Sequence, residues 1–331
     1  MDILKFIFAI FVVGIHTSFM TNFNSTFQWY ILHIFFRMAV PFFFTASGFL
    51  FGKKYINNRK NLKEVSRKQI KRLLIPFVFW MLVGLPYIIY TLQDNDGITI
   101  VLEIVKKAIF YPWGALWYIL ALIVAIFIEY WVLKRGKLSI AILVGVFLYF
   151  ICLLGNSYYF LIDSTPIKSI VDTYMSIFIS TRNGIFEAFP MFTMGVYLAY
   201  KENKIERMKA SKLIISFIIV LLIQVCEITF IRNRNYIDDH SLFFTTIPIS
   251  CLLLIFCIKC KKIEFKRINT QILRNLSTSI YFMHYPIIWT LSFFNIYMKN
   301  WETLIFTVII SIIISLILYK INNKYINYII K

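Results

Sequence analysis

The chain has 331 residues, of which 60% are hydrophobic and only 15% are charged. Because soluble domains carry about 25% charged residues, this composition excludes an ordinary water-soluble fold and predicts a protein solvated largely by lipid. The net charge of +19 would suit a nucleic-acid partner, but no RNA- or DNA-binding module is visible. We therefore expect no nucleic-acid partner and attribute the charge to cytoplasmic loops that face anionic lipid.

Ten runs along the chain are candidates for membrane-spanning helices, since a span needs about 20 mostly apolar residues. They lie near residues 3–21, 31–52, 73–92, 115–133, 138–155, 184–200, 211–231, 241–258, 276–296 and 302–322. We therefore predict an all-α, multi-pass plasma-membrane protein in which residues 1–331 form a single transmembrane domain within the lipid bilayer. The run from Ile167 to Ile179, in the longest outer segment, fits a helix that either lies along the membrane interface or dips into the bundle.

Lys and Arg divide unevenly between the two sides of this arrangement. If the N-terminus is cytoplasmic, Arg37 lies within a span, and the outer segments hold Lys106, Lys107, Lys168, Arg182, Arg232, Arg234 and Lys299. The rest of the 35 Lys and Arg residues fall in inner segments, which is a strong positive-inside signal. An even number of spans then predicts that both termini are cytoplasmic.

Lys5 and His16 lie on the first predicted span, eleven positions apart. Eleven residues make close to three helical turns, so both side chains share one face and are separated by roughly 16 Å along the helix. This stripe suits a substrate with a phosphate at the cytoplasmic rim and a reactive end deeper in the bundle. The alternative is a snorkelling lysine and a hydrogen-bonded core histidine.

Two further segments admit both a functional and a packing interpretation. Ser47 lies beside Gly48 in a bulky helix and is either a nucleophile or a small residue that allows close helix packing. Lys68, Lys71 and Arg72 lie at the inner mouth of the third span. They either signal topology or clamp a polyphosphate.

Polar groups that are energetically unfavourable in the hydrocarbon core also occur within later spans. Arg37 is a cation inside the second span and is a functional candidate for that reason. Trp117 opens the fourth span, where placement in the interfacial aromatic belt explains it adequately. Tyr281 and His284 share one face of the ninth span, and the proline that follows at position 286 permits a kink beside a cavity.

Several of these segments, taken in order, resemble the acyltransferase-3 family of ten-span membrane acyltransferases, nearly from end to end. The marks are Asp2 to Lys5 continuing to His16, Phe43 to Phe49, the basic run before Leu73 to Pro76, Leu116 to Tyr118, Gly195, and Ser279 to Pro286. The first-helix motif of the family is an arginine, ten residues and a histidine. Lys5 stands here in place of that arginine, so the charge is kept and the bidentate phosphate grip is lost.

A closer resemblance is to the membrane domain of vancomycin-resistance serine racemases. It is carried by Arg37 to Phe44, Gly155 to Ser157, Thr165 to Ile167, and Thr181 to Phe186. The resemblance brings forward Arg37 and Arg182 as features of this branch. Those proteins continue into a soluble racemase domain, whereas this sequence stops at Lys331, so we do not expect racemase activity.

The family resemblance implies an O-acyltransferase that moves an acyl group, most often acetyl, from acetyl-CoA to a hydroxyl of an extracytoplasmic glycan or small molecule. In the hypothesis that follows, the CoA phosphates meet Lys5, Lys68, Lys71 and Arg72, and His16 acts as the general base or carries the acyl group. We expect a substrate cavity lined by Arg37, Ser47, Trp117, Arg182, Tyr281 and His284. No permanently bound cofactor and no metal is expected.

Two other functions remain open from the sequence. The chain is alternatively an amino-acid transporter or supply protein that handles L-serine, as the resemblance to the racemase membrane domain implies. Arg37 and Glu227, both within predicted spans, suit that interpretation. The third possibility is a partner subunit of a separate extracytoplasmic transferase or hydrolase.

Overall fold

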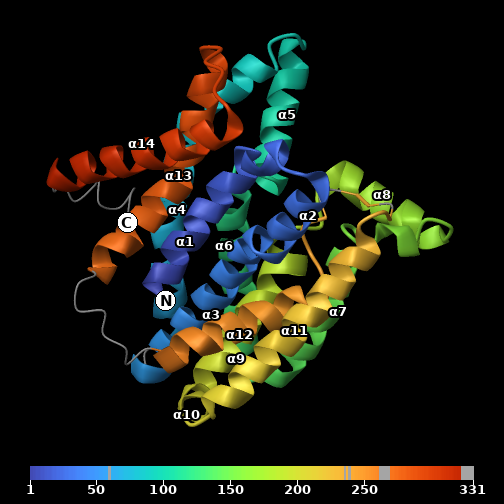
Figure 1. Ribbon diagram of the computed structural model, residues 1–331, viewed down its shortest axis with the longest axis vertical. Coiled ribbons are helices and arrows are strands. Elements are labelled where there is room, and N and C mark those ends of the chain that lie inside the picture. Colours follow the sequence, from blue (N-terminus) through green and yellow to red (C-terminus); the bar gives the residue numbers. More distant parts are fainter. Residues whose placement is uncertain (59–60, 235, 238–239, 261–268, 322–331) are drawn as a thin grey trace. The chain divides into compact units, whose positions relative to one another are not determined.

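The computed structural model of the protein describes residues 1–58, 61–234, 236–237, 240–260 and 269–321, and the regular structure in these ranges is entirely helical (Figure 1). The chain divides into two compact units. Unit 1 comprises Met1, Val40–Ile70 and Ala121–Lys266, and unit 2 comprises Asp2–Ala39, Lys71–Leu120 and Arg267–Lys331.

Unit 2 contains the first helix of the chain and the last helix that the structure describes. Its helices are α1 (Asp2–His16), η1 (Phe19–Asn22), α2 (Ser25–Ile34), η2 (Phe36–Met38), the later part of α4 (Leu62–Thr91), α5 (Gly97–Phe110), the first turn of α6 (Trp117–Lys134), α13 (Thr270–Phe293) and α14 (Asn300–Ile321).

Helices α1 and α13 lie side by side and run in the same direction (Figure 1). At their starts, Arg274 donates to the Asp2 carboxylate at 2.8 Å. Further along, His16 at the end of α1 contacts Tyr285 of α13. Two polar contacts, one near each end of α1, therefore fix the register of this pair.

Helix α4 also runs parallel to α13, and α14 returns antiparallel. Trp80 of α4 stacks on Phe282 with ring centroids 5.8 Å apart and planes at 7°, and further along both helices Tyr87 stacks on Trp289 with centroids 5.2 Å apart. On the return, Ser315 of α14 donates to Ser279 of α13 at 2.9 Å. The helices predicted as spans one, three and nine thus share a direction that span ten reverses.

Unit 1 is built from the remaining helices. They are α3 (Ala39–Asn58), the start of α4, most of α6, α7 (Leu138–Leu154), η3 (Tyr159–Leu161), α8 (Pro166–Phe178), η4 (Gly184–Ala188), α9 (Phe189–Tyr200), α10 (Glu202–Glu206), α11 (Ala210–Ile231) and α12 (Thr246–Lys259).

The closest backbone approach in unit 1 joins α3 and α9. A Cβ added at Gly48 would lie 2.0 Å from the Phe192 carbonyl oxygen, so only glycine fits there. Further along α3, Lys53 forms an ion pair at 2.6 Å with Glu202, the first residue of α10, which follows α9 directly. The order of these contacts makes α3 and α9 parallel, as alternating threading requires of spans two and six.

Helices α6 and α7 pack on α9 in opposite directions. Glu129 near the end of α6 accepts a hydrogen bond at 2.7 Å from Thr193 of α9. Gly145 in the middle of α7 approaches Pro190 at the start of α9, and beyond the end of α7 the chain meets the segment that precedes η4. Directions in unit 1 therefore also alternate along the chain.

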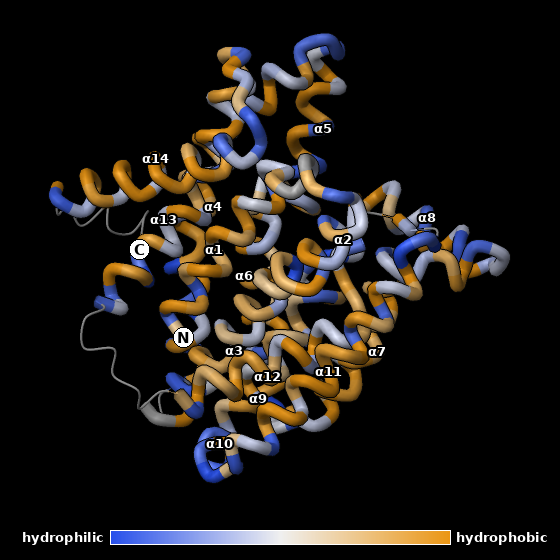
Figure 2. Tube along the Cα trace, in the orientation of Figure 1, coloured by the Kyte–Doolittle hydropathy of each residue, from blue (hydrophilic) through white to orange (hydrophobic). Residues whose placement is uncertain are grey.

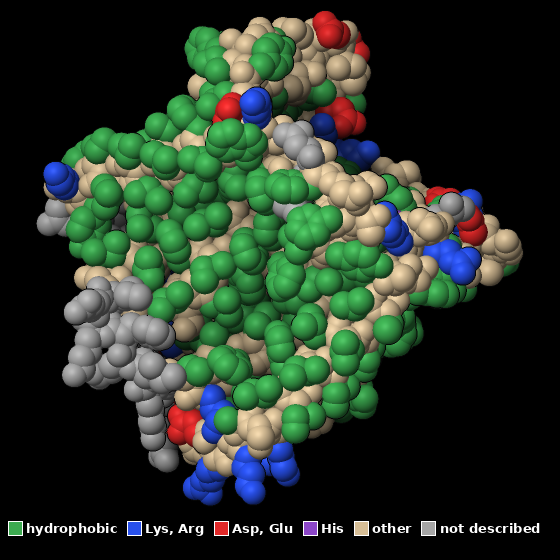
Figure 3. All heavy atoms as spheres, viewed as in Figure 1, with side chains coloured by type: hydrophobic (Ala, Val, Ile, Leu, Met, Phe, Trp, Pro, Cys, Tyr) green, Lys and Arg blue, Asp and Glu red, His purple; other side chains and the backbone are tan. Residues whose placement is uncertain are grey.

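Five helical segments of the described chain are long and apolar enough to cross a membrane, by length and composition. They are Ser25–Ile56, Leu62–Thr91, Trp117–Lys134, Ala210–Ile231 and Asn300–Ile321. Figure 2 shows α11 and α14 apolar along most of their length, and Figure 3 shows hydrophobic side chains covering the visible face of α14. Such exposed apolar faces indicate a lipid-solvated exterior.

Each of the ten predicted runs falls on a helix, but some boundaries differ from those predicted. The first run is predicted over residues 3–21, whereas α1 ends at His16. Its 15 residues correspond to about 22 Å, which is less than the thickness of the hydrocarbon core. His16 therefore lies at the end of a helix rather than within one.

Candidate functional site

His16 is the last residue of α1, and the residues after it end the helix. The Thr17 hydroxyl donates to the Val13 carbonyl at 3.1 Å, and Ser18 has a φ of 50°, with which a right-handed helix cannot continue. The Asn300 amide at the start of α14 donates to the Ser18 carbonyl at 3.1 Å. The backbone around His16 is therefore held from two helices.

Tyr285 of α13 holds the imidazole of His16. The Tyr285 Oη and His16 Nδ1 atoms are 2.8 Å apart, and the two ring centroids are 4.6 Å apart. A tyrosine hydroxyl both donates and accepts hydrogen bonds, so it serves either tautomer of the histidine. The contact fixes the orientation of the ring, with Nδ1 as the nitrogen that faces Tyr285.

His284, one residue earlier on α13, is completely buried. Its Nδ1 lies 3.1 Å from the Ile280 carbonyl, and because a carbonyl only accepts hydrogen bonds, Nδ1 carries the hydrogen. Nε2 then keeps its lone pair, and it has no hydrogen-bond partner among the described residues. The ring stacks on His16, with centroids 5.5 Å apart and planes at 23°.

The loop between α5 and α6 covers the tyrosines of α13. Gly114 has a φ of 64°, and a Cβ at this position would lie 2.9 Å from the Tyr285 ring. The next residue, Ala115, accepts a hydrogen bond at its carbonyl from the Tyr281 hydroxyl. Glycine is needed here both for its conformation and for the close approach to Tyr285.

Trp117 follows this loop and is buried, with 7% of its surface exposed. Its ring stacks on Tyr111 at the end of α5, with centroids 5.6 Å apart and planes at 6°. The stacked pair closes the base of the loop that contacts the α13 tyrosines. Trp117 is therefore buried in unit 2, where its placement in an aromatic belt was one interpretation of the sequence. Its place in a substrate cavity stays a prediction.

Arg37 lies in η2, a short turn that packs against the end of α1. The neighbouring Phe36 ring lies 4.5 Å from the Phe11 ring, and a Cβ at Gly14 would lie 3.0 Å from it. Gly14 precedes His16 by two residues. The turn thus brings Arg37 to the end of α1 that carries the histidine.

The predicted phosphate-binding cations lie near the starts of their helices. Lys5 is partly buried in the second turn of α1. Lys71 and Arg72 are exposed on the part of α4 that belongs to unit 2, and Lys68 is exposed one turn earlier, in unit 1. Their i, i+3, i+4 spacing places these three on one face of α4.

Ser47 is partly buried on α3 in unit 1, next to the tight packing of Gly48 against Phe192. Gly48 itself lets the backbones of α3 and α9 approach each other. The two roles that the sequence leaves open for Ser47, nucleophile and packing residue, stay predictions.

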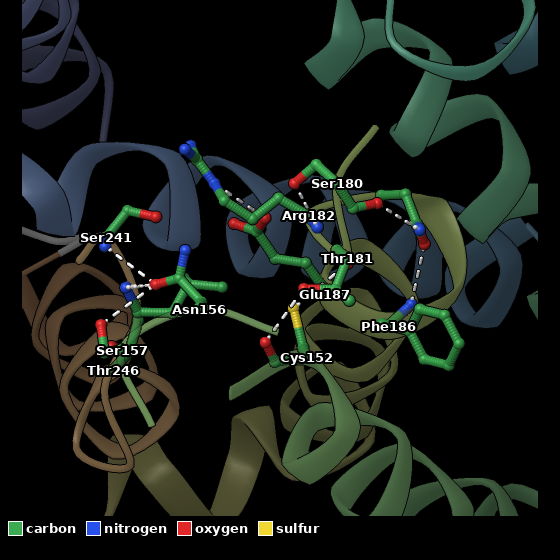
Figure 4. A network of polar contacts seen from close by, with 12 residues as sticks. Cys152, Asn156, Ser157, Ser180, Thr181, Arg182, Phe186, Glu187, Ser241 and Thr246 are labelled. Atoms are coloured by element: carbon green, nitrogen blue, oxygen red, sulfur yellow. Dashed lines mark hydrogen bonds and ion pairs between the residues drawn. The ribbon is translucent and has the colours of Figure 1, made fainter. Parts of the chain in front are cut away.

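Arg182 lies in unit 1 beside a turn of π-helix, η4, as Figure 4 shows. Its Nε is 3.7 Å from Oε2 of Glu187, and the two side chains are only 10% and 1% exposed. The preceding Ser180 hydroxyl accepts from the Arg182 backbone N–H at 2.9 Å. Asn183 caps the turn by accepting from two backbone N–H groups of η4.

Asn156 is a second buried polar centre of unit 1 (Figure 4). Its carboxamide oxygen accepts from the backbone N–H groups of Ser241 and Leu242 at 3.0 and 3.1 Å and from the Ser157 hydroxyl at 3.0 Å. Asn156 thus ties the end of α7 to the segment that leads into α12. The sequence brought this residue forward only as part of a family motif.

Glu227 of α11 binds the same segment. Its carboxylate accepts from the Tyr158 hydroxyl and, at 3.1 and 2.6 Å, from the backbone N–H and hydroxyl of Thr245. Burial raises the pKa of Tyr158 well above its ordinary value, and the hydrogen bond to Glu227 raises it further. Glu227 therefore stabilises the loop between its own helix and α12.

Sequence reasoning missed Tyr285 as a residue of the histidine cluster. It lies within the Ser279 to Pro286 segment that carries the family resemblance, so a signal was present. Helical periodicity alone could not pair it with a residue 269 positions earlier in the chain.

Comparison with known proteins gives one family. A family model described as an acyltransferase domain matches residues 1–320. An amino-acid racemase of Enterococcus faecalis is 29% identical over 246 residues, which cover 73% of this chain and 30% of the relative. A second amino-acid racemase of that organism is 25% identical, covering 77% and 36%.

A serine/alanine racemase of Enterococcus gallinarum is 28% identical over 218 residues, which cover 65% of this chain and 30% of the relative. The chain therefore spans about a third of the length of these curated relatives. No solved structure matches it.

Proposed function

The chain belongs to the acyltransferase-3 family of membrane proteins, and from this premise we propose that it is a membrane-bound O-acyltransferase. In this proposal it moves an acyl group, acetyl in particular, from cytoplasmic acyl-CoA to a hydroxyl of an extracytoplasmic glycan or small molecule. The observation that carries the proposal is the cluster of His16, Tyr285 and His284 in unit 2. In such a cluster the His16 imidazole is a base oriented by Tyr285, and the buried imidazole of His284 lies beside it.

His16 is the general base of the proposed reaction. The scheme uses the tautomer in which Nδ1 carries the hydrogen and faces Tyr285. Nε2 then takes the proton of the acceptor hydroxyl as the oxygen attacks the thioester carbonyl. The tetrahedral intermediate collapses, its C–S bond breaks, and the CoA thiolate takes the proton back from the imidazolium. The products are the O-acyl ester and CoA, and His16 returns to its neutral form.

Neighbouring groups orient the reactants in this scheme. The lone pair on His284 Nε2 accepts a hydrogen bond from a second hydroxyl of the acceptor, because the attacking hydroxyl gives its only hydrogen to His16. The Tyr285 hydroxyl hydrogen turns towards the oxyanion. Arg37, brought to the end of α1 by η2, adds positive charge. Lys5, Lys71 and Arg72, all in unit 2, meet the CoA phosphates.

We also propose ten spans with both termini in the cytoplasm, in the plasma membrane. Helix directions within each unit support this threading. In unit 2, α1, α4 and α13 are parallel and α14 is reversed, as spans one, three, nine and ten would be. In unit 1, α3, α6 and α9 are parallel, as spans two, four and six would be.

The test is transfer of radiolabelled acetyl from acetyl-CoA, supplied at the cytoplasmic face of membrane vesicles, into base-labile esters of the envelope fraction. His16→Ala should reduce the transfer by about a hundredfold or more, because general base catalysis contributes that much. His240→Asn is the matched control, because asparagine tolerates the positive φ of 48° at position 240. Transfer by His16→Ala at the wild-type rate would refute the mechanism.

A second function is favoured by one observation in unit 1. The buried pair of Arg182 and Glu187 puts opposite charges beside a π-helical turn, where they suit the carboxylate and ammonium groups of L-serine. The relatives' names agree with an amino acid as the ligand, and they name racemases rather than transporters. Accumulation of labelled L-serine in proteoliposomes that contain no acyl donor would favour transport over acyl transfer.

A further inference from the structure

Helix α13 repeats the spacing that made α1 a candidate. Lys5 precedes His16 by eleven positions, and Arg274 precedes Tyr285 by the same number. The two later residues meet through the 2.8 Å contact between Tyr285 and His16. Because α1 and α13 are parallel, the two earlier residues lie at a common level near the helix starts.

A separate contact supports the conclusion that Lys5 and Arg274 lie at the same height. Arg274 donates through Nη2 to the carboxylate of Asp2 at 2.8 Å, and Asp2 lies one turn before Lys5 on α1. The cations of α1 and α13 therefore lie near each other. The Arg274 side chain is 52% exposed, so its guanidinium remains accessible while it holds Asp2, whose side chain is 15% exposed.

Helix α4 contributes a third cation at this level. Trp80 stacks on Phe282, and both helices run in the same direction from there. Arg72 precedes Trp80 by eight positions, and Arg274 precedes Phe282 by eight positions. Three parallel helices thus each carry a cation at corresponding heights, with Asp2 as the acidic group on the same rim.

We infer that Arg274 binds the phosphates of the acyl-CoA donor together with Lys5 and Arg72, an inference that rests on the proposed function. Its planar guanidinium supplies the bidentate grip on phosphate that a lysine at position 5 lacks. The rise from this level to His16 is roughly 16 Å. The extended pantetheine arm of CoA has a comparable length, so the thioester arrives at the histidines.

The competing explanation is that Arg274 and Asp2 only clamp α1 to α13. Substitution of the acidic partner, Asp2, distinguishes a helix clamp from a phosphate site. A clamp is lost equally when either side chain is neutralised. A phosphate site loses affinity when Arg274 is neutralised, and keeps or gains affinity when the nearby Asp2 carboxylate is removed.

The experiment measures equilibrium binding of CoA, dephospho-CoA and pantetheine to the purified full chain in lipid nanodiscs. Arg274→Gln should weaken CoA binding by about tenfold or more, the usual effect of losing charge-assisted hydrogen bonds, and should leave pantetheine binding unchanged. The CoA affinity of Arg274→Lys should fall between those of the wild type and Arg274→Gln. Asp2→Asn should bind CoA at least as tightly as the wild type.

Two outcomes overturn the inference and leave the proposed function intact: CoA binding that is unaffected by Arg274→Gln, or equal losses in Arg274→Gln and Asp2→Asn. If Arg274→Gln fails to fold, the charge-retaining Arg274→Lys decides, because unchanged CoA affinity in that variant contradicts a bidentate role. A wild-type protein that binds neither CoA nor dephospho-CoA would instead refute the acyl-CoA donor itself.

Discussion

The two units use buried polar groups in different ways. In unit 1, Asn156, Asn183 and Glu227 accept hydrogen bonds from backbone N–H groups of loops and helix ends. In unit 2, the polar side chains of α1 and α13 bind each other, and His284 keeps a ring nitrogen without a partner among the described residues. A bond to backbone stabilises a loop, whereas a buried base without a partner suits a reactant.

The largest expected effect on stability comes from breaking the buried ion pair of unit 1. Arg182→Gln leaves the Glu187 carboxylate buried without its guanidinium and should lower the free energy of unfolding by about 3–5 kcal/mol. Denaturant unfolding of the purified protein in detergent measures this. The double variant with Glu187→Gln should lose less, because no unpaired charge remains.

An Arg182→Gln variant of wild-type stability would contradict a structural role for this pair. If that variant also failed to bind L-serine, the transport alternative would gain support and the contrast between the units would weaken.

Unit 2 should respond in activity rather than stability. Tyr285→Phe removes the group that orients His16 Nδ1, and kcat for acetyl transfer should fall by roughly tenfold to a hundredfold with KM for acetyl-CoA unchanged. The loss in unfolding free energy should stay near 1 kcal/mol, the value of one hydrogen bond. Tyr87→Phe, which removes a hydroxyl contact to Ser292 in the same unit, is the matched control.

A Tyr285→Phe protein with normal kcat would show that His16 needs no orienting partner. A fall in kcat with an equal rise in KM would instead assign Tyr285 to donor binding.

The smallest effect should come from a helix cap of unit 1. Asn183→Ala removes the side chain that accepts from two N–H groups of η4 and should lower the unfolding free energy by about 1 kcal/mol. Asn24→Ala removes an equivalent cap from α2 in unit 2 and serves for comparison. An Asn183→Ala variant that is stable but has lost acetyl transfer would contradict the assignment of this centre to stability.

Much of the fold follows from the residues alone. The apolar runs predict where the helices occur, because spans need continuous apolar length, and each predicted run falls on a helix. The family resemblance, drawn from short motifs in order, is confirmed by the match over residues 1–320. The count of ten spans and the cytoplasmic termini stay predictions.

Helix ends were less predictable than helix positions. The first predicted span continues past His16 to residue 21, but the Thr17 hydroxyl and the positive φ of Ser18 end α1 earlier. Local hydrogen bonds and backbone conformation decided this boundary, and hydropathy reports neither.

By itself, the sequence determined the all-helical class, the family, and the pairing of Lys5 with His16 on one helical face, because composition and periodicity are properties of a single chain segment. Only the tertiary structure decided which helices meet. It placed Tyr285 on His16, Arg274 on Asp2 and His284 beside them, because the register between α1 and α13 is set by packing between segments more than 260 positions apart. Periodicity within either helix contains no information about that register.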